Sequence, residues 1–283
     1  MAWQNTLLSF EQNKQWHQAI TYMQNVIAEH PNDVDVAIFM NYLLMYVIVY
    51  EGMDVIIDEY YQFLAKKYFK ESYAKFSENA EYLYFSGRIA VMGQWYFDLE
   101  DEEVEDMLAK ALQLDKDNQL YQWSFRSDLH LSNLECKYFS KTLIADGSSV
   151  RKQLESKGAV GAYLLRMIIE SSKTNKERVY TKINEYLLDH IDSKSLCVGF
   201  RYYYLQMIED KEECDLEEKK LFVELFSIAD KSLEFREGRS IFIGTPFLEL
   251  ELKQKILEVK EILADQYGKA MAEAFIINSI NAG

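Results

Sequence analysis

The stretch WQNTLLSFEQNKQWHQAITYMQNVIAEHPN, residues 3–32, decides the fold of this chain. Its apolar residues recur at helical spacing in two segments that a short polar turn separates. The first segment places Trp3, Leu7 and Phe10 on one face, and the second has its own apolar face, made of Trp16, Ala19, Ile20, Met23 and Ile27. Pro31 follows at the point where the second helix has to stop. The stretch therefore predicts two amphipathic helices joined by a turn.

The rest of the chain repeats this alternation of helix and short break. With two Pro and eleven Gly residues, sustained helix is favoured over a many-turned β architecture. Helices are predicted over residues 33–51, 55–68, 71–93, 102–114, 119–133, 135–144, 159–171, 176–191, 196–209, 216–232, 247–267 and 269–280. Residues 235–244 are expected to form a loop or a brief extended piece. The prediction is an all-α fold of antiparallel helix pairs stacked as an α-solenoid.

Local signals refine these boundaries. Asp54, Ser193 and Thr245 are predicted to cap the helices that follow them. In the helix over 55–68, the side chains expected to face inward are Ile57, Tyr60, Tyr61 and Leu64. A helix is predicted to start at Ser148 or Ser149, and Gly158 and Gly161 to open a helix or allow close packing.

The opening stretch resembles a tetratricopeptide repeat (TPR) unit, which has an early Trp, a later aromatic residue, a small Ala in its second helix and a closing Pro. The residues at those positions are Trp3, Leu7, Phe10, Ala19 and Pro31, with Met23 in place of the usual second aromatic. Residues 104–123 give a partial second match. The resemblance implies a TPR-like solenoid whose groove binds peptides or protein domains. The loop at 146–149 divides it into N-terminal TPR-like repeats, 1–145, and C-terminal helical repeats, 146–283, continuous with the first half.

Charge and composition narrow the class of partner. The formal net charge of −15 disfavours direct nucleic-acid binding, which needs clustered Lys and Arg. No secretory signal is expected at the start of the chain, and the apolar residues 34–50 are interpreted as a buried repeat helix because Asp35 and Asn41 interrupt them. Three cysteines without a CxxC pattern indicate reduced thiols in a cytoplasmic protein. No membrane partner is predicted.

No motif for catalysis, metal or cofactor binding is found. The sequence has no HExxH, GxSxG, P-loop or GxGxxG pattern, and its four His residues are isolated. The isolated histidines are His17, His30, His130 and His190. We therefore expect no catalytic residue, no metal ligand and no cofactor.

Two acidic runs are the main candidates for partner binding. The first run consists of Asp98, Glu100, Asp101, Glu102, Glu103, Glu105 and Asp106. The second consists of Glu209, Asp210, Glu212, Glu213, Asp215, Glu217 and Glu218. Both runs are expected to be solvated at helix starts, where negative charge suits the helix dipole. The residues predicted to contact a basic partner are Glu102, Glu103, Glu105 and Asp106, together with the tyrosines Tyr202, Tyr203 and Tyr204.

Aromatic clusters are the second lead. Tyr202, Tyr203 and Tyr204 point about 100° apart around a helix, so they cannot share one core face. At least one of them is expected at the surface, where Tyr serves as an interface anchor. The cluster Trp95-Tyr96-Phe97 poses the same question.

These observations favour a non-catalytic scaffold that binds a basic protein partner through an acidic, aromatic-rich surface. A sharper version is an immunity-type protein that covers and neutralises a toxin. Two alternatives stay open: a helical-bundle enzyme or small-molecule binder with a pocket that no linear motif reveals, and a peptide-sensing regulator.

Overall fold

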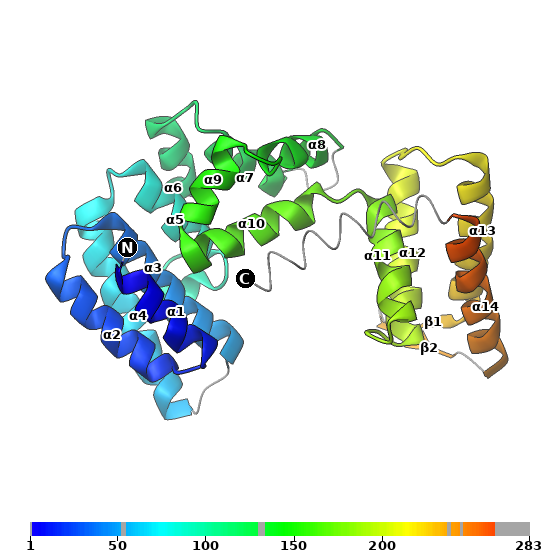
Figure 1. The fold of residues 1–283 in the computed structure, drawn as a ribbon, viewed down its shortest axis with the longest axis horizontal. Coiled ribbons are helices and arrows are strands. Elements are labelled where there is room, and N and C mark those ends of the chain that lie inside the picture. The colour runs from blue at the N-terminus through cyan, green and yellow to red at the C-terminus, as the bar shows by residue number, and fades with distance from the viewer. Residues whose placement is uncertain (1, 52–54, 130–133, 237–238, 244–245, 264–283) are drawn as a thin grey trace. The chain divides into compact units, whose positions relative to one another are not determined.

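The computed structural model describes residues 2–51, 55–129, 134–236, 239–243 and 246–263 (Figure 1). The first helices are α1 (Ala2–Gln12), α2 (Trp16–Glu29), α3 (Val34–Tyr46), α4 (Val55–Phe76), α5 (Ala80–Ala90), α6 (Asp101–Leu114) and α7 (Gln119–Leu129). A π-helical turn, Val47–Glu51, continues α3, and a 3-10 turn, Gln94–Phe97, precedes α6. The later helices are α8 (Leu134–Leu143), α9 (Ser149–Ser156), α10 (Gly158–Ser172), α11 (Asn175–Leu187), α12 (Ser193–Glu209), α13 (Leu216–Lys231) and α14 (Pro246–Ile262).

The prediction of an all-α fold is confirmed. The stretch expected to be a loop or a brief extended piece is a short antiparallel hairpin of β1 (Leu233–Arg236) and β2 (Arg239–Phe242). Its register places Leu233 opposite Phe242. The expected caps Asp54 and Thr245 and the expected helix over 269–280 lie outside the described residues.

The chain forms two compact units, which are described separately below. Unit 1 comprises Met1–Leu129 and Thr142–Leu165, and unit 2 comprises His130–Lys141 and Arg166–Gly283. This division differs from the expected boundary between residues 145 and 146. The segment from Thr142 to Leu165 returns to unit 1 because Leu154 and Leu164 are fully buried and Lys157 bonds to acids on α3 and α5.

The two opening helices lie where the sequence predicts them. Ala19 is completely buried, and Trp3 packs edge-on against Phe39 of α3 with ring centroids 5.0 Å apart. After Pro31, the Asp33 carboxylate caps α3 by accepting a hydrogen bond from the Asp35 N–H at 2.9 Å. The hydrophobic face of this helix pair therefore covers α3, as the 3.6-residue period requires.

Helix α3 is the core of unit 1. Every side chain from Val36 to Met45 is buried, and the helix contacts α2, α4 and α5. Among the described residues, Val34–Glu51 is the one helical segment long and apolar enough to cross a membrane, and 67% of it is buried inside the protein. Its hydropathy is accounted for by packing on several sides.

The predictions around α4 are partly wrong. This helix continues to Phe76, so no helix spans 71–93; Asn79 instead caps α5 by accepting from the Tyr82 N–H at 2.9 Å. Tyr61 and Leu64 are buried as expected, whereas Ile57 and Tyr60 are 42% and 48% exposed. The Lys- and Glu-rich stretch after Tyr68 favours helix, which is why the break comes later than predicted.

The returning segment of unit 1 turns sharply between α9 and α10. Gly158 has a φ of +54°, and a Cβ there would lie 3.1 Å from the Phe39 ring. A Cβ on Gly161 would lie 1.7 Å from the Leu154 carbonyl oxygen. The two glycines thus open α10 and allow its close approach to α9, as predicted. Tyr163 follows on α10, with its ring 5.9 Å from that of Tyr42.

Unit 2 has its own apolar core between α11, α12, α13 and α14. Phe200 and Phe222 are fully buried at its centre, in edge-to-face contact at 6.1 Å. The expected cap of α12 was one residue too late, because Asp192, not Ser193, accepts from the Ser195 N–H at 2.7 Å.

Candidate protein-interaction surface

The exposed side of α6 carries the first acidic run. Val104, Met107 and Ala111 turn toward the core, so the opposite face of the helix is left to the acids. The four acids among the predicted contact residues are all exposed: Glu102, Glu103, Glu105 and Asp106. The predicted C-terminal end of this helix is also correct, since α6 ends at Leu114.

These four acids differ in their local partners. The Glu103 carboxylate accepts the Glu100 N–H at 2.9 Å, which completes a capping box at the start of α6. Glu102, Glu105 and Asp106 form no hydrogen bond or ion pair through their side chains with any residue that the structure describes. This part of α6 therefore presents unneutralised charge, and Glu103 contributes to the helix start as well.

An exposed tryptophan lies on the turn directly before α6. Trp95 is 59% exposed, whereas Phe97 of the same turn is buried and stacks on Phe69 with ring centroids 4.6 Å apart. The Gln94 amide donates a hydrogen bond to the Asp101 carboxylate, which fixes this turn against the first residue of α6. The aromatic cluster thus contributes the Phe97 ring to the core and exposes the Trp95 ring on the turn before α6.

The tyrosine cluster on α12 divides in the same way. Tyr202 is 59% exposed, Tyr203 is half-buried beneath the Arg178 guanidinium, and Tyr204 is buried and stacked on Phe200 at 5.8 Å. At least one tyrosine reaches the surface, as the angular argument requires. Tyr204 is instead a core residue, which corrects its assignment to a contact surface. The cluster belongs to unit 2 and the α6 acids to unit 1.

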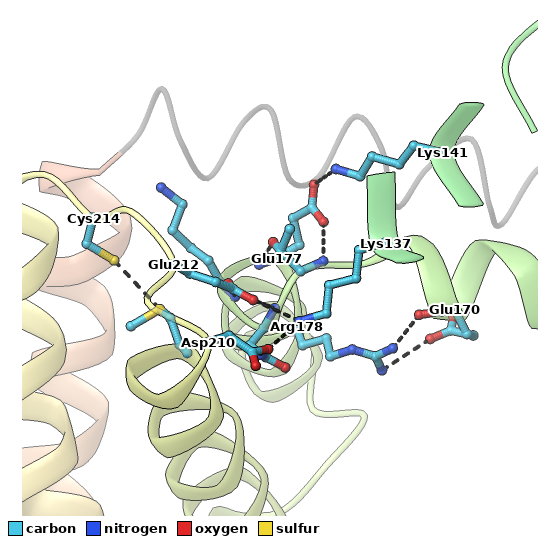
Figure 2. A network of polar contacts seen from close by, with 12 residues as sticks. Lys137, Lys141, Glu170, Glu177, Arg178, Asp210, Glu212 and Cys214 are labelled. Carbon is cyan, nitrogen blue, oxygen red and sulfur yellow. Dashed lines mark hydrogen bonds and ion pairs between the residues drawn. The ribbon is translucent and has the colours of Figure 1, made fainter. Parts of the chain in front are cut away.

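The second acidic run is solvated only in part. Glu209, Glu213, Asp215 and Glu217 are exposed, as predicted, whereas the other three acids of the run are largely buried, contrary to the prediction. The side chains of Asp210, Glu212 and Glu218 are 10%, 4% and 2% exposed. Lys137 of α8, 4% exposed, donates to Asp210 at 2.8 Å and to Glu212 at 3.0 Å (Figure 2). We call Lys137, Asp210 and Glu212 the buried clamp of unit 2.

Both carboxylates of the clamp accept further hydrogen bonds. Glu212 accepts the Asn175 and Lys176 N–H groups, each at 2.8 Å, so its charge lies at the N-terminus of α11. Asp210 accepts the Asn175 side-chain amide at 2.9 Å. These hydrogen bonds fix both carboxylates in position. The clamp therefore joins α8, α11 and the loop after α12.

Glu218 has an equivalent role at the start of α13. One of its oxygens accepts the Tyr180 hydroxyl at 2.8 Å, and the other accepts the Lys176 ammonium at 3.0 Å. Burial and the neighbouring Glu218 carboxylate raise the pKa of Tyr180 far above its usual range. These contacts could not be predicted from the sequence, because Tyr180 and Lys176 lie 38 and 42 residues away from Glu218.

A hollow of ≈ 770 Å³ opens to solvent beside this network, lined by side chains that include Met207, Lys211, Glu212 and Cys214. The Cys214 thiol points to the Met207 sulfur at 3.6 Å (Figure 2). Burial, followed by the charge of Glu218, raises the Cys214 pKa to about 11, and burial raises that of Cys197 to about 12. Both thiols are therefore protonated at neutral pH and weakly nucleophilic.

The described histidines do not gather. His17 lies on α2 with its Nδ1 3.3 Å from the Tyr61 hydroxyl, His30 and His190 are exposed, and His130 lies outside the described residues. Within the described part of the chain, no group of three or more His, Cys, Asp or Glu residues is placed to hold a metal ion.

Comparison with known proteins found no matching protein-family model, no matching curated protein and no matching solved structure.

Proposed function

We propose that this protein is a non-catalytic scaffold that binds a basic protein partner through the acidic face of α6 and the adjacent Trp95. The observation that carries the proposal is the group of three exposed carboxylates, on Glu102, Glu105 and Asp106, that no described cation neutralises. In unit 1 the neighbouring acids are treated differently: Asp98 pairs with Lys66 at 3.2 Å, and Glu78 pairs with Lys110 at 2.6 Å.

Trp95 supports the proposal independently of charge. Large aromatic side chains are the commonest anchors of protein interfaces, and a polar or charged rim around such an anchor is the usual arrangement. Trp95 is exposed on a turn that Phe97, a second aromatic residue of the same turn, fixes to the core. A partner with Lys or Arg side chains around an apolar recess would fit this surface.

The proposal includes a TPR-like solenoid as the architecture and an immunity-type role for the protein. Antiparallel pairs such as α1 with α2 and α5 with α6 are consistent with a TPR-like solenoid. A net charge of −15 favours fast association with a basic protein, as expected of an immunity-type protein that neutralises a toxin. Tyr202 offers a second exposed aromatic contact on unit 2.

Matched baits test the proposal. The full-length protein, an α6 variant (E102Q, E105Q, D106N) and a control variant (E217Q, E249Q, E261Q) are immobilised and exposed to native cell lysate. The control residues are likewise exposed acids that form no ion pair with described residues, so both variants change net charge equally. Bound proteins are identified by mass spectrometry at low and high salt.

We expect the wild-type and control baits to retain the same basic protein at low salt and to lose it at high salt, and the α6 variant not to retain it. With that protein purified, the α6 variant should associate about tenfold more slowly, because steering by charge acts on the association rate. W95A should accelerate dissociation, with a loss of about 2 kcal/mol. Equal retention by the α6 variant and the control would refute the proposal.

A further inference from the structure

A chain of aromatic rings runs along the end of α3 into its π-helical turn. The ring centroids of Trp16 and Tyr46 are 5.5 Å apart, those of Tyr42 and Tyr46 are 5.8 Å apart, and those of Tyr46 and Tyr50 are 5.3 Å apart. The exposed fraction of the side chain rises along this series of rings: Tyr42 is 7% exposed, Tyr46 is half-buried and Tyr50 is 57% exposed. We call Tyr42, Tyr46 and Tyr50 the tyrosine ladder.

The ladder is regularly spaced because its residues follow one another at intervals of one helical turn. The transition to π-helix over Val47–Glu51 keeps Tyr50 next to Tyr46 at the point where α3 ends. Single π-turns cost stability relative to regular α-helix and are found frequently at functional sites. On the inner side, Tyr163 of α10 closes the ladder by contacting Tyr42.

One carboxyl group near this ladder has no side-chain partner among the described residues. The Glu11 side chain, near the end of α1, is half-buried and forms no hydrogen bond or ion pair with any residue that the structure describes. Its negative charge acts on the hydroxyls of Tyr42 and Tyr46. Contacts on either side of Glu11 bring it there: Trp3, earlier on α1, packs against Phe39 of α3, and Lys14 pairs with Glu51, the residue after Tyr50.

The electrostatics of Glu11 are unusual for a stable surface. Burial alone raises its pKa to about 7, which means that no neighbouring cation offsets the desolvation. The nearest described cation acting on the ladder, Lys14, is instead paired with Glu51 at 3.6 Å. An acid kept half-buried and unneutralised lowers stability, and such groups concentrate at binding sites.

We propose that Glu11 and the tyrosine ladder form a binding site for a single cationic group, a guanidinium or ammonium ion. The faces of aromatic rings attract cations through their quadrupoles, and a carboxylate beside them supplies a charge-assisted hydrogen bond. A bound cation would supply the neutralisation that Glu11 lacks. The site lies apart from the α6 acids, and it does not depend on the function proposed above. The cation could be a free amine or the side chain of a Lys or Arg residue in a peptide.

The binding should weaken at acid pH. Below pH 7 Glu11 becomes protonated and loses its charge, whereas burial keeps the pKa of Tyr42, Tyr46 and Tyr163 above the ordinary value, so these hydroxyls stay neutral. The other charged groups that act on the ladder are Glu51, Lys14 and, from α5 through Tyr163, Arg88. A variant without a carboxyl at position 11 separates the effect of Glu11 from theirs.

The test is a titration followed by NMR of the full-length protein with ¹³C-labelled tyrosine rings. Resonances of the ladder are assigned with Y46F and Y50F, and the probe is Nα-acetylarginine amide, with acetylglycinamide at matched ionic strength as the neutral control. We expect saturable shifts of Tyr46 and Tyr50 at about pH 8, and an affinity lower by about tenfold or more in E11Q, where a charged acceptor is lost. The same loss is expected for the wild type near pH 5.5.

Two further arms sharpen the outcome. K14Q removes a competing cation and should strengthen binding of the probe. Spermidine and the peptide acetyl-Gly-Arg-Gly-amide distinguish the two sources: equal or tighter binding of spermidine indicates a free amine, and tighter binding of the peptide indicates a protein side chain. The proposal is overturned if no saturable shift occurs, or if E11Q or acetylglycinamide gives the same shifts as the wild type with the cationic probe.

Discussion

Replacement of Lys137 by Met is the sharpest test of the buried clamp. The Lys137 ammonium is 4% exposed and is shared between Asp210 and Glu212, which are themselves nearly buried. Met fills a similar volume but leaves both carboxylates without their cation. Breaking a buried ion pair in this way typically costs 3–5 kcal/mol, roughly, because a charge is left uncompensated.

The structure places K137M at the lower end of that range. Glu212 keeps the two N–H groups at the start of α11, and Asp210 keeps the Asn175 amide. We therefore expect a loss of about 3 kcal/mol, or a fall of about 10 °C in the melting temperature of unit 2. Adding D210N should restore about 1 kcal/mol, since it removes one of the uncompensated charges.

The matched control is K141M, on the same helix. Lys141 is 37% exposed and pairs with Glu177, which is 21% exposed, so this substitution should cost about 0.5 kcal/mol or less. Stability is measured by urea unfolding followed by circular dichroism, with hydrogen exchange of peptides from α11 to α13 identifying the transition of unit 2. A loss below 1 kcal/mol for K137M, or one equal to that of K141M, would refute the clamp as a stabilising contact.

Three further substitutions probe other contacts. G161A places a Cβ 1.7 Å from the Leu154 carbonyl oxygen and should destabilise unit 1 by about 3 kcal/mol in urea unfolding, whereas G199A meets only the flexible Lys182 side chain, 3.2 Å away, and should be close to neutral. Y180F removes the hydroxyl that donates to buried Glu218 and should cost about 2 kcal/mol, against no measurable change for the exposed Y202F. Because burial raises the folded-state pKa of Glu11 above its unfolded value, native Glu11 binds more protons than unfolded Glu11 between pH 4.5 and about 7, so stability should fall as pH rises through this window. E11Q should abolish that component and be the more stable protein at neutral pH, and equal stability of the two at all pH values would contradict it.

Periodicity and capping residues predicted much of the helical structure. Helix α6 ends at Leu114 and helix α13 begins at Leu216, both as predicted, because each of these residues lies next to a strongly polar break. The break between α4 and α5 was misplaced, although Asn79, which caps α5, was a usable signal. The helical stretch around Glu71 has no glycine or proline to end it, so local propensity alone could not place the boundary.

The direction of aromatic side chains was predictable only in part. The spacing of Tyr202, Tyr203 and Tyr204 required that they diverge, but it could not say which of them faces the core. The choice depends on two rings that pack against Tyr204: Phe200 on the same helix and Phe226 on α13. The position of Glu11 beside the tyrosine ladder was likewise not predictable from the sequence, because it depends on tertiary contacts of α1 such as that of Trp3 with Phe39.

The two acidic runs have similar composition. They differ in burial because described cations from other helices reach the second run but not the acids on α6. In unit 2, Lys137 and Lys176 reach the second run from other helices, and the start of α11 adds two backbone donors to Glu212. Burial of these acids is therefore compensated. On α6 no described cation reaches Glu102 or Asp106, and both side chains are exposed, so a partner that covers them has to bring its own positive charge. For this reason the first run, and not the more compact second one, is the surface on which a basic partner is expected to bind.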